Sequence, residues 1–347
     1  ASAIACLYIL ISGKIKGDSI TKQMLQRDTI TDPTGATAKK LVVCCLPIAL
    51  ISVIMTFANM IDMLTVNPCI KTAMKASSHT FDSLLSDKLT TDMLPNFIYG
   101  SYTGLAVTVF GLVPTITAMF GKSILPSLAE SCAKNDKKAM QSDLTKMLIV
   151  TSIIAIPAGM GIAFLSEPIL RFLFGGRETE IQVCIMPMSI LGIAVIFLAI
   201  ATPCFSILQT LGKPHKAIII MLAGGIIKLL IRQPIINISG AAISTLVSEV
   251  FICVLSVRSV CKMTDLKPKV SEIFVKPTYA AIMCSVTAAL SHETLTKIAH
   301  LQINHRFVTL FSIGIGSTMY FFCLYLLCET PKNIVNYIFS KKNPQNP

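Results

Sequence analysis

The sequence predicts an all-α membrane protein, a polytopic bundle of about eight transmembrane helices with part of a further helix at the N-terminus. Of the 347 residues, 53% are hydrophobic and only 14% are charged, whereas soluble domains carry about a quarter charged residues. Several apolar stretches reach the roughly 20 residues that a membrane-spanning helix needs. Because the bilayer core holds no water to pair with backbone groups, each stretch must form a helix.

The first twelve residues are apolar but too short to span a bilayer, and they carry neither an initiating methionine nor a basic segment. A signal peptide does not fit this pattern, so we interpret residues 1–12 as the end of a truncated transmembrane helix in a fragment of a longer protein. Residues 13–42 form a polar, basic loop. Eight apolar spans follow, over residues 43–66, 97–121, 147–165, 183–209, 217–236, 238–257, 275–291 and 307–328.

The positive charges gather on one side of this predicted membrane. If residues 13–42 are cytoplasmic and the sides alternate, cytoplasmic segments hold 21 of the 30 Lys and Arg residues and the opposite side holds 7. This bias follows the positive-inside rule, and it makes residues 329–347 a cytoplasmic tail. The net charge of +12 is then a sign of membrane topology. A nucleic-acid partner would need basic residues on one folded surface, and none is expected.

The sequence offers little for catalysis or metal binding. Most of the twelve cysteines lie in apolar spans and none forms a C-x-x-C pair, so we interpret them as small buried hydrophobic residues. His292, His300 and His305 lie in or beside the last outer loop, with a spacing that matches no metal site. The P-loop, H-E-x-x-H and G-x-S-x-G motifs are absent from the sequence. No metal, other cofactor or enzymatic activity is therefore expected.

Ionisable residues inside the membrane are candidates for function because their burial is costly. Lys228 and Glu249 lie on consecutive spans joined by a short turn, Asn237–Ser239. The two helices should therefore be antiparallel neighbours, with the charges at depths of roughly 12 and 15–17 Å. Two interpretations remain: a buried ion pair that fastens the hairpin, with Glu249 as partner or coupling group, or a Lys228 side chain that meets an anionic substrate in a central cavity.

Three further polar residues lie nearer the outer face. Arg232 is one helical turn from Lys228, so both should project from the same face. Two cationic groups suit a phosphate or pyrophosphate, although Arg232 could instead extend to the membrane interface. Asp62 could pair with Arg232 across the bundle. Asn59 shares the face of Asp62, where both could form a polar gate or ion site, or bond to a neighbouring helix.

Glycines and prolines recur within the spans, among them Gly104 and Gly111. They fit ordinary membrane-helix packing and also the bent helices of transporters.

Five strings, in order, resemble known transporter motifs. They are LP…N-x-x-D within residues 46–66, LPNFIYGSYTGLAVTVFGLVPTITAMFGKSILPSLAE at 94–130, LSEPILRFLFGG at 165–176, SILQTLGKPHKA at 206–217 and GGIIKLLIRQPIINISGAAISTLVSEV at 224–250. The order and spacing resemble the stage V sporulation protein B-like members of the multidrug/oligosaccharidyl-lipid/polysaccharide superfamily. The chain departs from the motifs at Thr210, where Gly is common, at Arg232, where a small polar residue is usual, and at Glu249.

This resemblance implies the C-terminal lobe of a two-lobe, MATE-like transporter. Residues 43–257 would form a six-helix bundle, residues 258–328 two additional helices, and the N-terminal lobe would be missing. It also implies a flippase in the bacterial plasma membrane that moves lipid-linked oligosaccharide or peptidoglycan precursor by alternating access. The polyprenyl pyrophosphate substrate would meet Lys228, Arg232, Asp62 and Asn59, and membrane lipids would surround the bundle.

Two alternatives stay open at this point. A cation-coupled multidrug antiporter would have an apolar cavity with one coupling carboxylate, and the cationic pair on one helix argues against it. The other alternative is a non-transporting fragment or a structural partner in envelope synthesis.

Overall fold

The computed structural model describes residues 93–232, 238–265, 271–298 and 305–327, together with a few isolated positions before them. The chain divides into two units, Ala1–Ala49 and Leu50–Pro347, and every helix discussed below belongs to the second. The predicted first span (43–66) and the predicted C-terminal tail (329–347) lie outside the described residues, as does the truncated helix at residues 1–12.

The described part of the second unit is helical throughout. Its elements are α4 (Leu94–Ser101), the π-helical turn η2 (Tyr102–Ala106), α5 (Val107–Ala133), α6 (Lys137–Phe164), α7 (Ser166–Phe174), α8 (Glu178–Thr210), α9 (Pro214–Arg232), α10 (Ile238–Thr264), the π-helical turn η3 (Ser271–Val275), α11 (Lys276–Ile298) and α12 (His305–Leu327). Seven segments of the described residues are long and apolar enough to cross a membrane. Each coincides with one of the seven predicted spans after the first, which confirms the predicted fold class.

The helices extend beyond the predicted spans. The helix predicted at 97–121 continues to Ala133, and the helix predicted from 147 begins at Lys137. Hydropathy marks only the part of a helix that lies in hydrocarbon, so polar turns that continue the same helix outside the bilayer escape it. The structure also places a short helix, α7, in a predicted outer loop.

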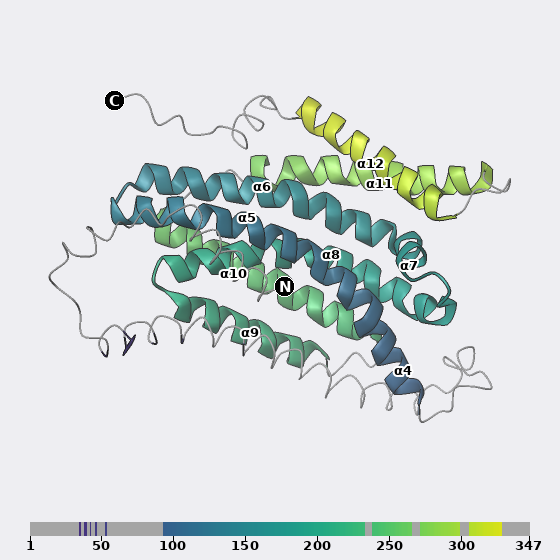
Figure 1. The fold of residues 1–347 in the computed structure, drawn as a ribbon, viewed down its shortest axis with the longest axis horizontal. Helices are drawn as coiled ribbons and strands as arrows, with labels where there is room; N and C mark the ends of the chain where they lie inside the picture. Colours follow the sequence, from purple (N-terminus) through teal and green to yellow (C-terminus); the bar gives the residue numbers. More distant parts are fainter. Residues whose placement is uncertain are drawn as a thin grey trace, which may run out of the picture. The chain divides into compact units, whose positions relative to one another are not determined.

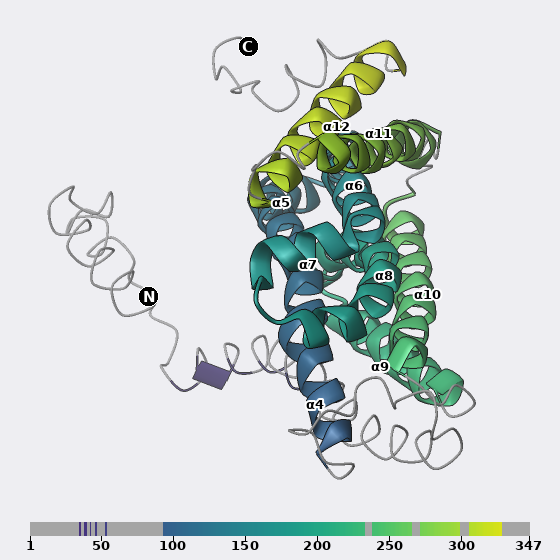
Figure 2. The same ribbon diagram turned by 90° about the vertical axis from the view of Figure 1, so that its right-hand side faces the viewer.

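Helix α8 is the centre of the bundle. It packs against α5, α6 and α10, and also contacts α7 and α9. A helix that is apolar on all sides is expected to be buried in this way. Figure 1 shows the long helices running side by side. In Figure 2, α11 and α12 lie beside α6, and α9 lies beside α10 at the opposite side.

Glycines set how closely these helices approach one another. A Cβ atom added to Gly159 of α6 would lie 2.6 Å from the carbonyl oxygen of Gly192 of α8, and one added to Gly192 would lie 2.9 Å from the carbonyl oxygen of Gly159. Similar close contacts occur at Gly121 (α5 against α8), Gly224 (α9 against α10) and Gly316 (α12 against α11). Without a hydrophobic force between helices in lipid, such small residues allow the close packing that joins them.

Two hydrophobic cores follow from this packing. The main core is built from residues of α4, α5, α6, α8 and their neighbours, and includes the fully buried Leu128, Met188 and Leu191. A second, smaller core joins α6 to the α11–α12 pair. Its buried members are Ile156, Ala280, Ala281, Cys284, Tyr320 and Leu324.

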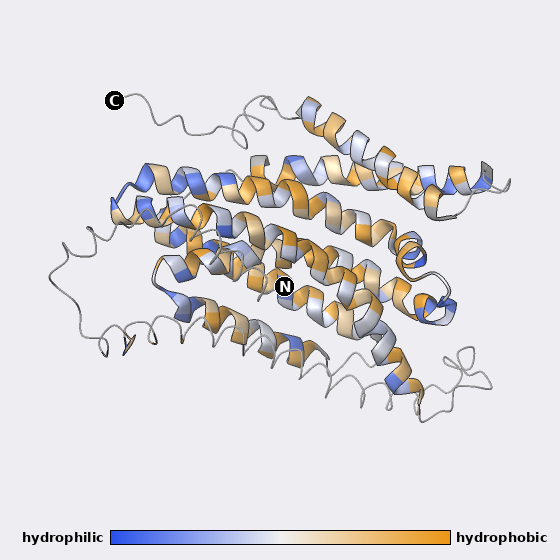
Figure 3. Ribbon diagram, viewed as in Figure 1, coloured by the Kyte–Doolittle hydropathy of each residue, from blue (hydrophilic) through white to orange (hydrophobic). Residues whose placement is uncertain are grey.

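Hydrophobic residues cover most of the length of the long helices, and hydrophilic residues gather at the turn between α5 and α6 (Figure 3). At this end Ser127 donates a hydrogen bond to the Asp143 carboxylate at 2.6 Å, which ties α5 to α6. Lys137 pairs with Asp265 at 3.2 Å and Gln141 donates to the carbonyl of Thr264, so the start of α6 is tied to the end of α10. These contacts lie in segments predicted to be cytoplasmic.

Helix α6 begins at a side-chain cap, which leads to a first prediction. The Asp136 carboxylate accepts hydrogen bonds from the backbone N–H groups of Lys138 and Ala139. Asp136→Ala should lower the free energy of unfolding by about 1 kcal/mol because the two donors lose their partner. Asp136→Asn keeps an acceptor and should melt like the parent protein in detergent. Equal losses for both variants would mean that the cap does not contribute.

Candidate functional site

The hairpin of α9 and α10 carries two of the charged residues singled out in the sequence. The Ser248 hydroxyl of α10 donates a hydrogen bond to the Gly224 carbonyl of α9 at 2.8 Å. A Cβ atom at Gly224 would lie 2.4 Å from the side chain of Ile252. The two helices are therefore in close contact at the level of Gly224 and Ser248, as the short turn predicted.

Lys228 and Glu249 lie next to this contact. Side chains of a helix lean toward its N-terminus, so Lys228 leans back toward the level of Gly224 and Ser248. Both residues are half-buried, and Lys228 is near enough for its charge to attract the Glu249 carboxylate. Within the described residues, the Oε2 atom of Glu249 is buried and has no hydrogen-bond partner. The structure thus places the two charged residues near each other. Both interpretations, an ion pair and a substrate contact, stay open.

The remaining predicted site residues are not placed. Arg232 is the last residue of α9, one turn beyond Lys228, and its side chain lies outside the described part. Asn59 and Asp62 also lie outside the described residues. The predicted pairing of Asp62 with Arg232 therefore stays a prediction.

A second feature was not singled out as a site in the sequence. Five exposed small or polar residues follow one another at intervals of three or four along α4, η2 and α5; they are Gly100, Gly104, Thr108, Gly111 and Thr115. We call this set the glycine–threonine stripe. The spacing places all five on one face of the continuous helix.

The glycine–threonine stripe does not pack against the other described helices at its glycines. A Cβ atom added to Gly100, Gly104 or Gly111 would meet nothing within 4 Å. The hydroxyl groups of Thr108 and Thr115 bond back to the carbonyls of Gly104 and Gly111, both at 2.8 Å. The repeat of Gly and Thr at helical spacing was the signal for this face. The mean hydropathy of the span did not reveal this face, because glycine and threonine lower that mean only slightly.

The π-helical turn η2 lies in the middle of the stripe, at Tyr102–Ala106. A π-turn inserts one residue more per turn and often marks a functional position. Here it joins α4 to α5 without a break, so that Gly100 and Gly104 stay in line with Thr108.

Another recognised string has a structural role. Helix α8 ends with Gly212 at φ +70°, a left-handed conformation that favours glycine. The N–H groups of Gly212 and Lys213 donate to the carbonyls of Gln209 and Leu208, both at 3.0 Å. Pro214 then begins α9. The string around LGKP therefore encodes a tight helix-to-helix turn that positions α9.

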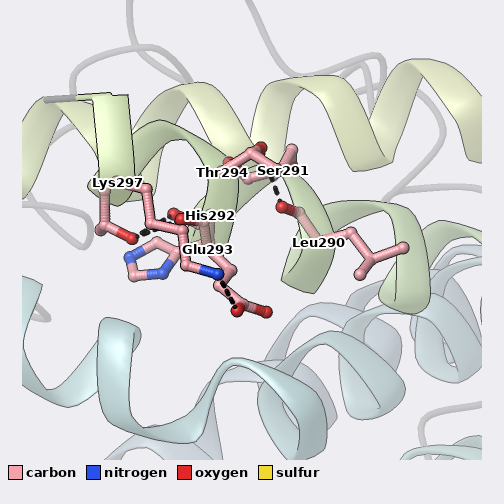
Figure 4. A network of polar contacts seen from close by, with 7 residues as sticks. Leu290, Ser291, His292, Glu293, Thr294 and Lys297 are labelled. Carbon is pink, nitrogen blue, oxygen red and sulfur yellow. Dashed lines mark hydrogen bonds and ion pairs between the residues drawn. The ribbon is translucent and has the colours of Figure 1, made fainter.

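Polar residues at the opposite end of the bundle form local networks. On α7, Arg171 donates hydrogen bonds to Glu167 at 3.0 Å and to Glu178 at 2.6 Å. The hydrogen bond that it donates to Glu167 is the main cause that raises the pKa of Arg171. Near the end of α11, Lys297 pairs with Glu293 at 2.7 Å beside His292 (Figure 4). Each of these charged side chains pairs with an opposite charge on its own helix or on the next helix. Among the residues that the structure describes, no cluster of His, Cys, Asp and Glu could hold a metal ion.

Comparison with known proteins identifies the family. Residues 89–309 match the model of the lipid II flippase MurJ family, a range that includes α4 to α11 and the two helices of the charged hairpin. The chain belongs to the MurJ family. Four of the five recognised strings fall inside the matched range, and the string at residues 46–66 falls before it.

Individual members of the MurJ family and its neighbours are distant in sequence. The chain is 20% identical over 223 residues to the lipid II flippase MurJ of Bacillus subtilis (strain 168), which is 61% of this chain and 40% of that protein. It is 24% identical over 236 residues to a probable flippase, AglR, of Haloferax volcanii, which is 67% of this chain and 47% of that protein. The chain thus spans less than half the length of these curated relatives.

A solved structure shares the fold of this chain. A transporter of the MOP superfamily from Pyrococcus furiosus superimposes with a TM-score of 0.50 at 15% identity, over 86% of this chain and 69% of that one. The family and the seven long apolar helices make this chain a multi-pass plasma membrane protein. The finer assignment to stage V sporulation protein B-like proteins stays a prediction.

Proposed function

We propose that this chain is part of a flippase that moves a lipid-linked oligosaccharide or peptidoglycan precursor across the plasma membrane. The observation that carries the proposal is the match to the lipid II flippase family over residues 89–309. The MurJ family transports lipid-linked precursors rather than converting them chemically, which agrees with the sequence-based expectation of a transporter. The stage V sporulation protein B-like type of flippase is the finer form of this proposal.

The cationic end of α9 is the proposed contact for the substrate's pyrophosphate. Lys228 is half-buried and Arg232 follows one turn later on the same face. Two cationic side chains at this spacing can donate hydrogen bonds to a diphosphate and so bind it. Glu249 would hold Lys228 in place, or act as a coupling group, when no substrate is bound. Asp62 and Asn59 are the proposed polar gate or ion site.

The glycine–threonine stripe is the proposed wall of the path for the sugar headgroup. Three glycines leave room and expose backbone, and two threonines add hydroxyl groups, whereas a lipid-facing helix surface needs large apolar side chains. The exposed neighbours Leu112 (55% exposed) and Ile116 (48% exposed) show what such a surface looks like on the same helix. A second bundle facing the stripe would complete the path.

The test of the proposal uses the full-length protein in proteoliposomes. A polyprenyl pyrophosphate-linked sugar is placed in the membrane, and an added sugar-modifying enzyme reports how much of it becomes accessible or protected with time. The proposal predicts movement well above that of empty vesicles. Efflux of cationic dyes without movement of the lipid-linked sugar would favour the multidrug antiporter instead, and neither activity would favour a non-transporting role.

A variant of the glycine–threonine stripe tests whether the stripe lines the transport path or packs against another helix. Gly111→Leu should slow transport about tenfold or more, because a leucine side chain would fill the path, while the melting temperature stays within the error of the parent protein. The matched control is Gly314→Leu on α12, where an added Cβ also meets nothing within 4 Å; it should change neither property. A drop in melting temperature for Gly111→Leu alone would indicate that the stripe packs against another helix.

A further inference from the structure

Helix α6 contains a proline that frees one backbone carbonyl. Pro157 lies inside α6, seven residues before its end. Proline has no N–H group, so the carbonyl of residue i−4, which is Ile153, loses its bond within the helix. In the membrane interior, where water is absent, an unpaired carbonyl costs several kcal/mol and needs another donor.

That donor comes from α12. The Tyr320 hydroxyl donates a hydrogen bond to the Ile153 carbonyl oxygen at 2.8 Å, and Tyr320 is only 4% exposed. Small residues of α11 make this contact possible: Ala280 and Ala281 are fully buried in the second core together with Tyr320. The tyrosine of α12 therefore reaches α6 across a part of α11 that has almost no side-chain volume.

The contact adds a hydrogen bond to the apolar surface through which α11 packs on α6. The second core joins the α11–α12 pair to α6 through Ile156, and Ile196 and Phe274 pack against both cores. A proline also marks the position where a membrane helix bends most easily. Any change in the bend at Pro157 changes the direction of the Ile153 carbonyl, which is the group that Tyr320 binds.

We propose that the hydrogen bond from Tyr320 to the Ile153 carbonyl is a latch that couples the bend of α6 to the seating of the α11–α12 pair. With the bond formed, the pair is held on α6 and the bend is fixed. When it breaks, the pair shifts as a unit while the main core stays folded. Pro157 strengthens the dependence on the latch because it supplies no N–H group, which leaves the Tyr320 hydroxyl as the donor for the Ile153 carbonyl.

The first test uses the absence of tryptophan from the chain. Phe274 lies in η3, which leads into α11, and packs against both the second core and the main core; Phe274→Trp supplies the one tryptophan of this chain. Brominated phospholipids in the vesicle quench it in proportion to its contact with lipid. Phe205→Trp in α8, which packs on the main core, supplies the matched reporter for the rest of the bundle.

Tyr320→Phe keeps the ring and removes only the hydroxyl. It should increase the ratio of released to docked α11–α12 pair by about five- to thirtyfold, seen as stronger quenching of the reporter at position 274 and unchanged quenching at position 205. Tyr325→Phe, on the exposed face of α12 (66% exposed), is the control and should change neither. Unchanged quenching at position 274, or equal changes at both positions, would overturn the latch.

A second variant tests the role of Pro157 and does not depend on the folding of a single mutant. In Pro157→Ala the new N–H pairs with the Ile153 carbonyl inside α6, so the carbonyl no longer depends on the Tyr320 hydroxyl for a donor. Tyr320→Phe should then lower the melting temperature of Pro157→Ala by clearly less than it lowers that of the parent protein, because the carbonyl keeps a donor inside α6. A loss of the same size and sign in both backgrounds would show ordinary packing by Tyr320 and would overturn the proposal.

Discussion

Lys228→Ala is expected to slow the transport of a lipid-linked sugar about 10- to 100-fold in the full-length protein. The reason is that a hydrogen bond to a charged group, worth about 1.5–3 kcal/mol, is lost. Lys228 lies half-buried in the membrane-spanning helix α9, beside the contact of Gly224 with Ser248. The proteoliposome assay described above measures the loss. Lys262→Ala, an exposed cation in the last turn of α10, is the control and should transport normally.

The loss has two possible origins, which a double variant separates. Removing Lys228 leaves the Glu249 carboxylate, whose Oε2 atom is already buried without a hydrogen-bond partner, without the attraction of the lysine charge. An unpaired buried charge is strongly destabilising, so Lys228→Ala should also lower the melting temperature. Replacing both residues, with Lys228→Met and Glu249→Gln, removes this charge and should restore most of the stability.

The transport rate of that double variant decides between the two interpretations. If Lys228 binds the anionic group of the substrate, transport stays low although the protein is stable again. If the pair only fastens the hairpin, transport returns together with stability. Lys228→Ala with normal transport would exclude Lys228 from the substrate path altogether.

The sequence predicted the helices well because hydrophobic length is a strong signal in a membrane protein. Its errors lie where helices leave the hydrocarbon. The first ten residues of α6, from Lys137, are mostly polar and were assigned to a loop. Helix α7 was missed because nine residues are too few for a span. Both segments are held by local contacts, such as the Asp136 cap, that hydropathy does not measure.

The candidate site was only partly accessible to the same reasoning. The proximity of Lys228 and Glu249 followed from a short turn between two antiparallel helices, which is a local property of the chain. The Tyr320–Ile153 bond joins residues 167 positions apart, and nothing in their local sequence connects them. Likewise, Gly192 and Gly111 look alike in the sequence, yet Gly192 lies in a helix crossing and Gly111 meets no other helix among the described residues.

The largest effect on stability is expected at that crossing, from Gly192→Leu. A Cβ atom at Gly192 would lie 2.5 Å from the backbone nitrogen of Ala163 and 2.9 Å from the carbonyl oxygen of Gly159. Backbone atoms of α6 cannot rotate away as a side chain can, so α6 and α8 must separate to admit even a methyl group. Overpacking of this kind costs about 3 kcal/mol or more when the neighbours are rigid, and the α6–α8 contact is part of the main core.

Thermal melting in detergent measures this effect with a thiol-reactive dye, because Cys184 and Cys204 of α8 are free and fully buried until the bundle unfolds. The matched control is Gly161→Leu on α6, where an added Cβ meets nothing within 4 Å. Because the added side chain meets no neighbour at its Cβ, this substitution should stay within about 0.5 kcal/mol of the parent protein. Because both variants add the same side chain to a glycine of the α6–α8 region, a difference between them isolates the crossing itself. Equal melting temperatures would mean that α6 and α8 do not approach each other closely at Gly192. The close packing that places α8 at the centre of the fold would then be contradicted.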